Sequence, residues 1–417
     1  MHRSPINISL RAVLLVTTIL SLPAAAQAAD AAGKWSDTIA FSGHAEAGIA
    51  FNPAAPGNDE NVGSLMTDRA NQVEMNQLFL TVERPIDSSS NKFDIGFRLQ
   101  GNFGTDARYT HSLAETDHLI HSRYQFDVNE ASVSMHLPTK MSFLDSVDLK
   151  LGQIPSPFSA EVIDATQNQL YSHSYIFNFG VPAKSTGALA TAHVNPMLDI
   201  YAGFDTGVNG GIDSRGDNNG NIKAQFGFGL NNLADGKLSV VALTHMGTEN
   251  PTNYGLPHTM RYLNDITATY KANDKWTFVT DVNYAQEDVT NSTAYGLAQY
   301  ATYTLNDNVS FTARGEMFRD NGGWVVVNPG YFDSANGQRG LPVSAGQYVG
   351  PHTTYGEFTL GMNWKPGFVP KAIAGTVVRP ELRVDHSFND SKPFNSSSTS
   401  LGDNTSFTPA VDVVVPF

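Results

Sequence analysis

Charged side chains occupy every second position of one segment near the end of the chain. They are Arg379, Glu381, Arg383 and Asp385. In an extended strand, residues two apart point to the same side, so these four would form one stripe. Alternating guanidinium and carboxylate groups on such a stripe can select ions in a water-filled passage. They can equally pair with one another as structural salt bridges, and the sequence leaves both roles open.

The same parity places more charged residues on the polar faces of other segments. With the stripe, they form a predicted pore-lining set of six basic and six acidic residues. Other acidic residues on the inward parity give the lumen a slight acidic excess, which favours cations. The additional members are Glu46, Asp94, Arg98, Glu130, Lys150, Lys223, Arg314 and Glu316.

Motifs for catalysis are absent from the sequence. There is no G-x-S-x-G, P-loop or H-E-x-x-H pattern, so we predict neither an enzyme nor a bound cofactor. One stretch could hold a metal ion, because imidazole and carboxylate groups suit several divalent ions. It contains His111, Glu115, Asp117, His118 and His121. We expect a solvated polar loop here, with no metal.

Residues 93–103 (FDIGFRLQGNF) show the kind of element that carries these side chains. Phe93, Ile95, Phe97, Leu99 and Phe103 share one parity, and polar residues occupy most of the other. This alternation indicates a strand with one apolar and one wet face. A half-buried strand of a soluble sandwich would give the same pattern, but such strands usually have about 5–6 residues. About 9–11 tilted residues cross a bilayer, so the length favours a membrane strand.

Sixteen such segments recur along the chain, and the connections between them alternate between long and short. An antiparallel transmembrane β-barrel has this organisation, with an even number of strands, long extracellular loops and short periplasmic turns. We therefore predict an all-β barrel of about 16 strands, with 14 or 18 as alternatives. The segments are 38–51, 73–83, 93–103, 124–137, 147–154, 186–194, 197–206, 221–230, 237–246, 262–270, 275–286, 294–305, 309–319, 354–365, 376–388 and 405–417.

The N-terminus has the features of a cleaved signal peptide. Arg3 and Arg11 precede or flank an apolar run, and an A-x-A site ends at Ala28. We predict a signal peptide over residues 1–28 and one barrel domain over residues 29–417. Cleavage removes two arginines and no acidic residue, which changes the net charge from −14 to −16. An acidic chain disfavours nucleic acid as a partner.

Several motifs resemble those of the OmpL-like putative β-barrel porin family. They include a Gly-x-x-Pro turn from Gly152, an acidic residue at Glu161, the stretch 171–175 (YSHSY), and Pro182 ahead of Gly187. The stretches 104–106 (GTD) and 379–383 (RPELR) are also similar to that family. The resemblance covers most of the mature chain. It implies an outer-membrane barrel that forms a pore, without implying a substrate.

Residues 155–184 form the third long loop and are rich in aromatic side chains. In general porins, which the chain resembles in layout, this loop enters the lumen and narrows it. We predict the same here, because the loop carries more apolar surface than a solvated loop should expose; an ordered external cap is the alternative. The candidate constriction residues are Glu161, Asp164, Tyr171 and Tyr175.

The remaining features concern the membrane and the assembly of the barrel. Outward aromatic residues such as Trp276 and Trp364 suit interfacial belts in contact with outer-membrane lipid. The terminal Phe417 resembles the recognition signal of the barrel assembly machinery. Similarity of layout to the general porins allows a homo-oligomer.

Together these observations predict a porin in the outer membrane of a Gram-negative bacterium, exported through its signal peptide. It would let small hydrophilic solutes or ions diffuse passively through its lumen. Two other functions remain open: a plugged barrel that acts as a surface adhesin or structural protein, and a barrel hydrolase with a catalytic triad at its rim or lipid face.

Overall fold

The computed structural model describes most of the chain. It covers residues 35–113, 122–212, 220–249, 258–289, 291–323, 352–397 and 402–417, with positions 115, 116, 119, 325 and 326. The predicted signal peptide lies outside these residues. No helix within them is long and apolar enough to cross a membrane.

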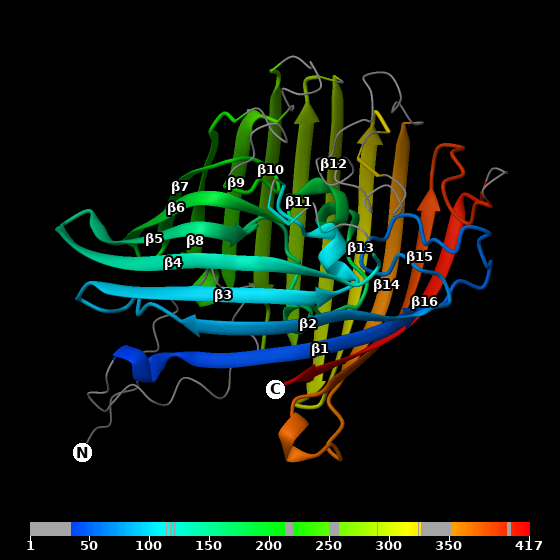
Figure 1. The fold of residues 1–417 in the computed structure, drawn as a ribbon, viewed down its shortest axis with the longest axis horizontal. Coiled ribbons are helices and arrows are strands. Elements are labelled where there is room, and N and C mark those ends of the chain that lie inside the picture. Colours follow the sequence, from blue (N-terminus) through cyan, green and yellow to red (C-terminus); the bar gives the residue numbers. More distant parts are fainter. Residues whose placement is uncertain are drawn as a thin grey trace.

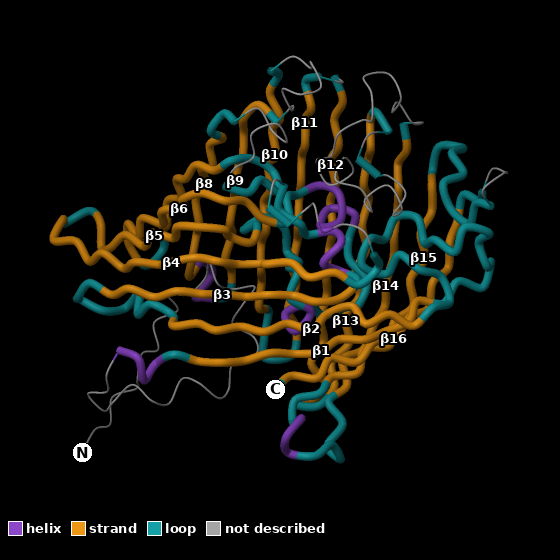
Figure 2. The backbone as a smooth tube through the Cα atoms, viewed as in Figure 1, coloured by secondary structure: helices purple, strands orange, loops and turns teal. Residues whose placement is uncertain are grey.

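The described residues form sixteen antiparallel strands that close into one barrel (Figures 1 and 2). Each strand pairs with its neighbours in the sequence, and β1 pairs with β16 to complete the ring. The strands are β1 (Ala40–Ala50), β2 (Val73–Arg84), β3 (Asp94–Gly104), β4 (Gln125–Met141), β5 (Leu144–Pro155), β6 (Lys184–Asn195), β7 (Leu198–Asp205), β8 (Lys223–Asn232), β9 (Leu238–Thr248), β10 (Met260–Lys271), β11 (Trp276–Glu287), β12 (Ser292–Asn306), β13 (Val309–Asn321), β14 (Thr353–Trp364), β15 (Val377–Ser387) and β16 (Thr405–Pro416).

The helical elements are short and lie in the connections. Their bounds are η2 (Trp35–Thr38), η3 (Asp106–Tyr109), η5 (Ala165–Gln167), η6 (Ile176–Gly180), α1 (Leu233–Gly236) and η8 (Lys371–Ile373). The prediction of an antiparallel barrel with sixteen strands is confirmed.

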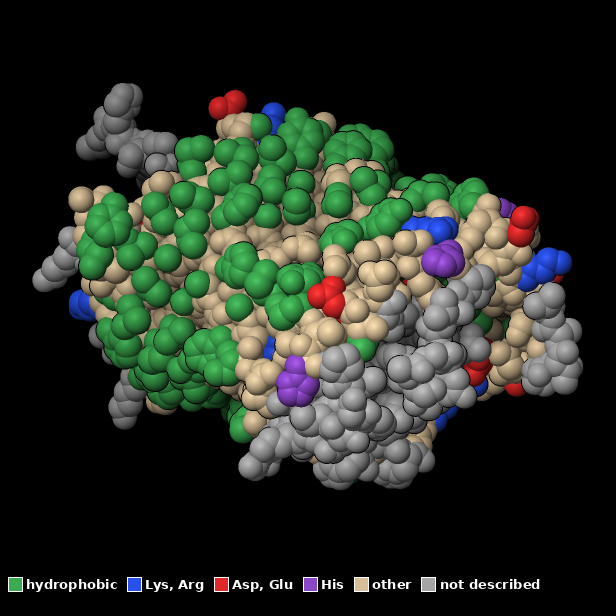
Figure 3. Space-filling view, turned by 90° about the horizontal axis from the view of Figure 1, so that it is seen from above, with side chains coloured by type: hydrophobic (Ala, Val, Ile, Leu, Met, Phe, Trp, Pro, Cys, Tyr) green, Lys and Arg blue, Asp and Glu red, His purple; other side chains and the backbone are tan. Residues whose placement is uncertain are grey.

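Alternation along each strand separates an apolar exterior from a polar interior. On β15, Arg379, Glu381 and Arg383 are buried inside the barrel, whereas Leu382 and Val384 are exposed on its outer surface. Hydrophobic side chains cover much of the outer surface seen in Figure 3, with few charges among them. Ring closure leaves no strand edge unpaired, which a bilayer requires because its core offers no water to backbone groups.

The two ends of the barrel differ in their connections. Odd-numbered strands lead to even-numbered ones through loops at what we call the long-loop end, and the remaining connections lie at the short-turn end. One loop departs from this rule, because only residues 288–291 join β11 to β12. The reason is that Glu287 pairs directly with Ser292, so both strands continue to a tight hairpin.

Three prolines lie within strands rather than at their ends, and each removes a backbone donor. Pro409 lies on β16 opposite Leu382, in an unbroken register. The sequence predicts a strand that ends at 137, but β4 continues to Met141, and the register shifts between Pro138 and Met141. The β14–β15 pairing stops at Gly361–Glu381 and resumes at Trp364–Val378, which skips Pro380. Both irregularities place the proline where the ladder is already interrupted.

The outward face of β12 offers a matched test of membrane depth. Leu297 lies in the middle of the strand and Leu305 near its short-turn end, with exposed fractions of 49% and 48%. We expect Leu297→Arg to lower the free energy of unfolding by about 2–4 kcal/mol and Leu305→Arg by about 0–1 kcal/mol, because burying a cation costs most at the bilayer centre. Urea unfolding in lipid vesicles measures both, and equal losses would contradict this placement of β12.

Candidate functional site

The connection between β5 and β6 crosses the inside of the barrel. We call residues 156–183 the inner segment. Inward side chains from distant strands bond to it, among them Gln77 of β2, Asp281 of β11 and Glu381 of β15. Strands so far apart in the ring can meet the same segment only from within the lumen. In Figure 1 its green turn η6 lies beside β12, and η6 packs against β11 and β12.

Local hydrogen bonds give the inner segment a defined shape. Asp164 caps η5 by accepting a hydrogen bond from the Thr166 amide at 3.0 Å. The side chain of Asn168 closes a loop with Val162, accepting from its amide at 3.0 Å and donating to its carbonyl at 2.6 Å. Asp164 also lies 3.7 Å from His44 of β1. The segment is therefore an ordered element rather than a solvated loop.

Carboxylates on the barrel wall accept hydrogen bonds from the backbone of the inner segment. Glu316 accepts from the amides of Tyr175 and Ile176 at 2.6 and 2.9 Å. Glu381 accepts from the amides of Tyr171 and Ser172 at 3.0 and 3.1 Å. Buried backbone donors need such partners where water is excluded. Two predicted lining residues therefore serve as anchors for the inner segment.

Arginines on the same wall satisfy the carbonyl groups of the inner segment. Arg314 donates to Ser172 at 2.7 Å, and Arg383 donates to His173 at 2.6 Å. Arg379 donates to two carbonyls at 2.9 Å, those of Ala165 and Asn168. The planar guanidinium suits this task because it presents several donors in a fixed geometry.

The anchoring charges are also paired with one another. Arg314 lies between Glu161 of the inner segment, at 2.7 Å, and Glu357 of β14, at 2.5 Å. Arg383 pairs with Asp385 at 2.8 Å. Arg379 pairs with Glu46 at 2.8 Å and with Asp412. These pairs are buried, so removing one partner would leave an uncompensated charge.

Glu161 is the charged centre of the inner segment. Burial alone would raise the pKa of its carboxyl group, but the Arg314 guanidinium and hydrogen bonds from His173 and Tyr300 lower the pKa to about 2. The His173 ring lies 2.8 Å from one carboxylate oxygen and the Tyr300 hydroxyl 2.8 Å from the other. Glu161 is therefore ionised at neutral pH, and its charge is matched by Arg314.

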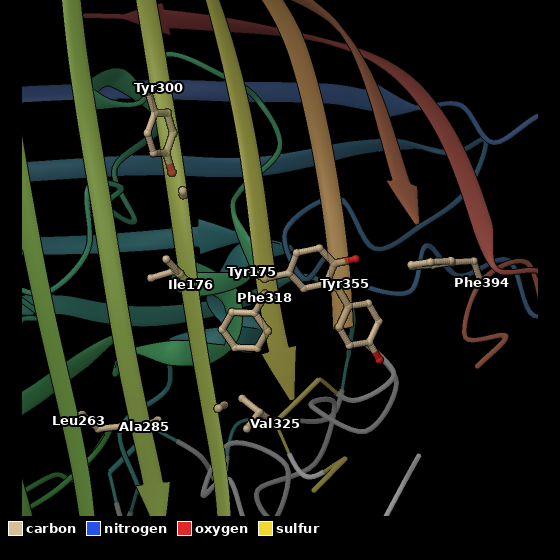
Figure 4. Packing of buried hydrophobic residues seen from close by; sticks show 11 residues of the cluster. Tyr175, Ile176, Leu263, Ala285, Tyr300, Phe318, Val325, Tyr355 and Phe394 are labelled. Carbon is tan, nitrogen blue, oxygen red and sulfur yellow. The ribbon is translucent and has the colours of Figure 1, made fainter. Parts of the chain in front are cut away.

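An apolar cluster holds the second half of the inner segment against the wall. Tyr175 and Ile176 are fully buried and pack with Phe318 and Tyr355 (Figure 4). The Tyr175 and Tyr355 rings stack with centroids 5.0 Å apart, and the Tyr175 hydroxyl donates to Asp385 at 2.9 Å. Tyr171 is buried in a separate cluster, and its hydroxyl donates to Asn76 at 2.9 Å.

Other predicted lining residues form a separate group on the opposite wall. Arg98 of β3 pairs with Glu83 at 3.1 Å and lies 3.5 Å from Glu130. Lys150 of β5 pairs with Glu130 at 3.0 Å. The side chains of Arg98 and Lys150 keep 22% and 37% of their surface exposed, although both face inward. These two cations are thus less covered than the arginines that hold the inner segment, although inward neighbours such as Glu130 and Gln100 are buried.

The last predicted residues join neither group. Asp94 pairs with Arg84 at 2.6 Å near the short-turn end. Lys223 is buried near the long-loop end, where its ammonium group donates to the Asn221 carbonyl at 2.7 Å. His111 is buried beside Gln125 at 2.6 Å.

The other members of the histidine stretch are only partly covered by the structure. Asp117, His118 and His121 lie outside the described residues. Within the described part of the chain, no three His, Asp or Glu residues gather at one place.

The sequence analysis does not predict several side chains that contact or support the inner segment. Asp265, Asp281 and Glu357 lie inside on strand parity and contact or support the inner segment. Parity was the signal that could have found them. The buried pair Arg108–Asp68, at 2.7 Å, lies between two loops, where alternation gives no guidance.

A protein-family model matches residues 38–417 of this chain. Its description is "Putative beta-barrel porin-2, OmpL-like". No curated protein sequence shows significant similarity to the chain.

Solved structures with the same fold are outer-membrane proteins of low sequence identity. The channel DcaP of Acinetobacter baumannii is similar with a TM-score of 0.53 at 11% identity, over 91% of this chain and 96% of that one. OprB of Pseudomonas putida gives 0.53 at 11% identity, over 92% and 95%. The trimer form of Vibrio cholerae OmpT gives 0.50 at 12% identity, over 91% and 99%. At such identities the similarity establishes the fold.

The lowered pKa of Glu161 predicts an acid-sensitive inner segment. The carboxylate form is favoured by folding, so its stabilisation is complete above about pH 4.5 and is lost as the pH falls towards 2. Between about pH 6 and pH 3, linkage predicts a loss of about 2 kcal/mol that Glu161→Gln does not show. Chemical unfolding in detergent micelles at both pH values measures this difference. The same pH dependence in the variant would contradict the assignment.

Proposed function

The chain belongs to the family described as "Putative beta-barrel porin-2, OmpL-like", and on this basis we propose that its lumen conducts small hydrophilic solutes or ions by passive diffusion. The family and the fold indicate an outer-membrane channel protein rather than an enzyme. A barrel of sixteen strands is wide enough for an aqueous channel. The solute class is the part that needs experiment.

The proposed passage runs between the inner segment and the wall formed by β3 to β5. The observation that carries this proposal is the contrast in exposure between inward-facing cations. Arg314 and Arg383 are covered by the inner segment, whereas Arg98 and Lys150 remain partly exposed. A charged side chain that faces inward and is still exposed requires water beside it.

The inner segment would set the width of this passage. Its backbone is held by carboxylates and arginines from β11, β13 and β15, which face the proposed passage from the other side. A segment so fixed cannot swing aside without breaking buried ion pairs such as Arg314–Glu161. We therefore propose a permanent constriction rather than a gate.

The proposed route to the membrane depends on both ends of the chain. Residues 1–28 would direct export, and the last strand would be recognised during barrel assembly. Phe417 exchanges two backbone hydrogen bonds with Gly43 of β1, both at 2.9 Å, so the terminal residue also seals the ring. Surrounding lipid and a homo-oligomer complete the proposed environment; one similar structure is described as a trimer form.

Removal of the inner segment tests its role in the width of the passage. We expect deletion of residues 156–178 to increase liposome swelling rates, most strongly for larger neutral sugars, because the constriction is gone. The folded state is checked by resistance to unfolding in detergent at room temperature. If a folded deletion variant shows the same size limit as the wild type, the inner segment does not form the constriction.

The charges on the β3–β5 wall test the proposed selectivity. The acidic excess of the lumen predicts a weak preference for cations. We expect the double variant Arg98→Gln, Lys150→Gln to shift the reversal potential further towards cations, because it removes the exposed positive charges of the passage. Lys271→Gln, at the end of β10 on the short-turn side, is the matched control and should change little. An anion preference in the wild type would contradict the proposal.

A further inference from the structure

Two carboxylates and an amide meet on the inner wall of β10 and β11. Asp265 lies directly across from Asn283, and Thr267 lies directly across from Asp281. All three side chains, Asp265, Asp281 and Asn283, are at least nine-tenths buried. They face the first turn of the inner segment, where Ser159 bridges the two carboxylates.

Each of these side chains leaves one oxygen without a hydrogen-bond donor. Asp265 Oδ1 accepts from the Ser159 amide at 3.0 Å, and Asp281 Oδ2 accepts from the Ala160 amide at 2.7 Å. The Asn283 amide nitrogen donates to the Gly180 carbonyl at 3.1 Å, which fixes the direction of its oxygen. The remaining oxygens, Asp265 Oδ2, Asp281 Oδ1 and Asn283 Oδ1, are buried and unpaired.

The two carboxylates also lack a counter-ion from the protein. They interact directly with each other, yet neither forms an ion pair with Lys, Arg or His within the described residues. The other carboxylates around the inner segment differ. Glu161 and Glu357 pair with Arg314, and Asp385 pairs with Arg383. Glu316 and Glu381 accept backbone amides on both oxygens. Two adjacent buried negative charges are strongly unfavourable, and either a cation between them or a proton on one of them relieves the repulsion.

We propose that Asp265, Asp281 and Asn283 bind one divalent cation, with Ca²⁺ as the best match. The three free atoms are all oxygens, which hard cations prefer. Ca²⁺ accepts an irregular set of six to eight oxygens, so water can complete its shell, whereas Mg²⁺ demands a near-ideal octahedron. The absence of nitrogen or sulfur donors makes Zn²⁺ a poor match.

The bound ion would join the wall to the inner segment. The carboxylates that would hold it also accept hydrogen bonds from Ser159 and Ala160, at the point where the segment leaves the β5 side. Ser159 has a φ of 73°, a left-handed conformation that a side chain rarely adopts without such fixation. The ion would therefore stabilise the entry of the segment into the lumen. This inference does not depend on whether the lumen conducts.

Calcium binding to the refolded, lipopolysaccharide-free protein in uncharged detergent tests the proposal. We expect isothermal titration calorimetry to give one Ca²⁺ per barrel, with weaker Mg²⁺ binding. We also expect the unfolding temperature to be higher in CaCl₂ than in EDTA, because a ligand of the folded state stabilises it.

Paired variants separate this site from other acidic positions. Asp265→Asn, Asp281→Asn should weaken Ca²⁺ binding at least tenfold and abolish the shift in unfolding temperature. Asp94→Asn, which removes a carboxylate already paired with Arg84, should retain both the Ca²⁺ binding and the shift in unfolding temperature.

No Ca²⁺ binding by the wild type would overturn the proposal and point to a proton shared by the two carboxyl groups. Equal binding by the double variant would overturn it as well. If the double variant does not fold, Asp281→Asn alone and the comparison of wild type in CaCl₂ and EDTA decide the matter.

Discussion

Hydrogen bonds between wall side chains and the backbone of the inner segment hold this segment inside the barrel, and the shape of the lumen depends on them. A segment inside a barrel loses water from its amide and carbonyl groups, and each group left unpaired is destabilising. Glu316 and Glu381 supply acceptors, while Arg314 and Arg383 supply donors. Because the same charged groups also pair with one another, the segment and the wall form one network. The charges on this wall are therefore occupied by contacts within the protein, whereas Arg98 and Lys150 on β3 and β5 keep part of their surface exposed.

The bilayer imposes the second constraint. It requires an apolar exterior and a closed ring, and both follow from strict alternation along each strand. The exterior is thus nearly uniform, as β12 and β15 illustrate with their outward leucines. Among the described residues, the β5–β6 connection bends inward, and Leu65, Met66 and Tyr109 of two other connections pack against it. Where the alternation is broken, as at Pro138 and Pro380, the pairing is locally interrupted but the ring stays closed.

The alternation of apolar and polar residues made the fold predictable, because it can be seen in consecutive residues such as those of 93–103. It also placed the charged residues of β13 and β15 on the inner face. Their partners were not predictable, because Tyr175 and Glu316 are 141 positions apart and meet only once the ring closes. For the same reason nothing in the sequence distinguished Asp281, which holds the inner segment, from other inward carboxylates. The end of β4 and the start of β5 differ from the predicted bounds 137 and 147, because Pro138 lies within the strand beside a shift in register.

The proposed function requires a continuous, water-filled passage beside the inner segment. Single-channel current recording of the refolded mature protein in a planar bilayer tests for this passage. Discrete current steps that rise linearly with voltage are expected, since the inner segment is fixed and the opposite wall stays wet. The absence of steps from protein shown to be folded would mean that the lumen is closed, and the barrel would then have to act through its loops or its surface.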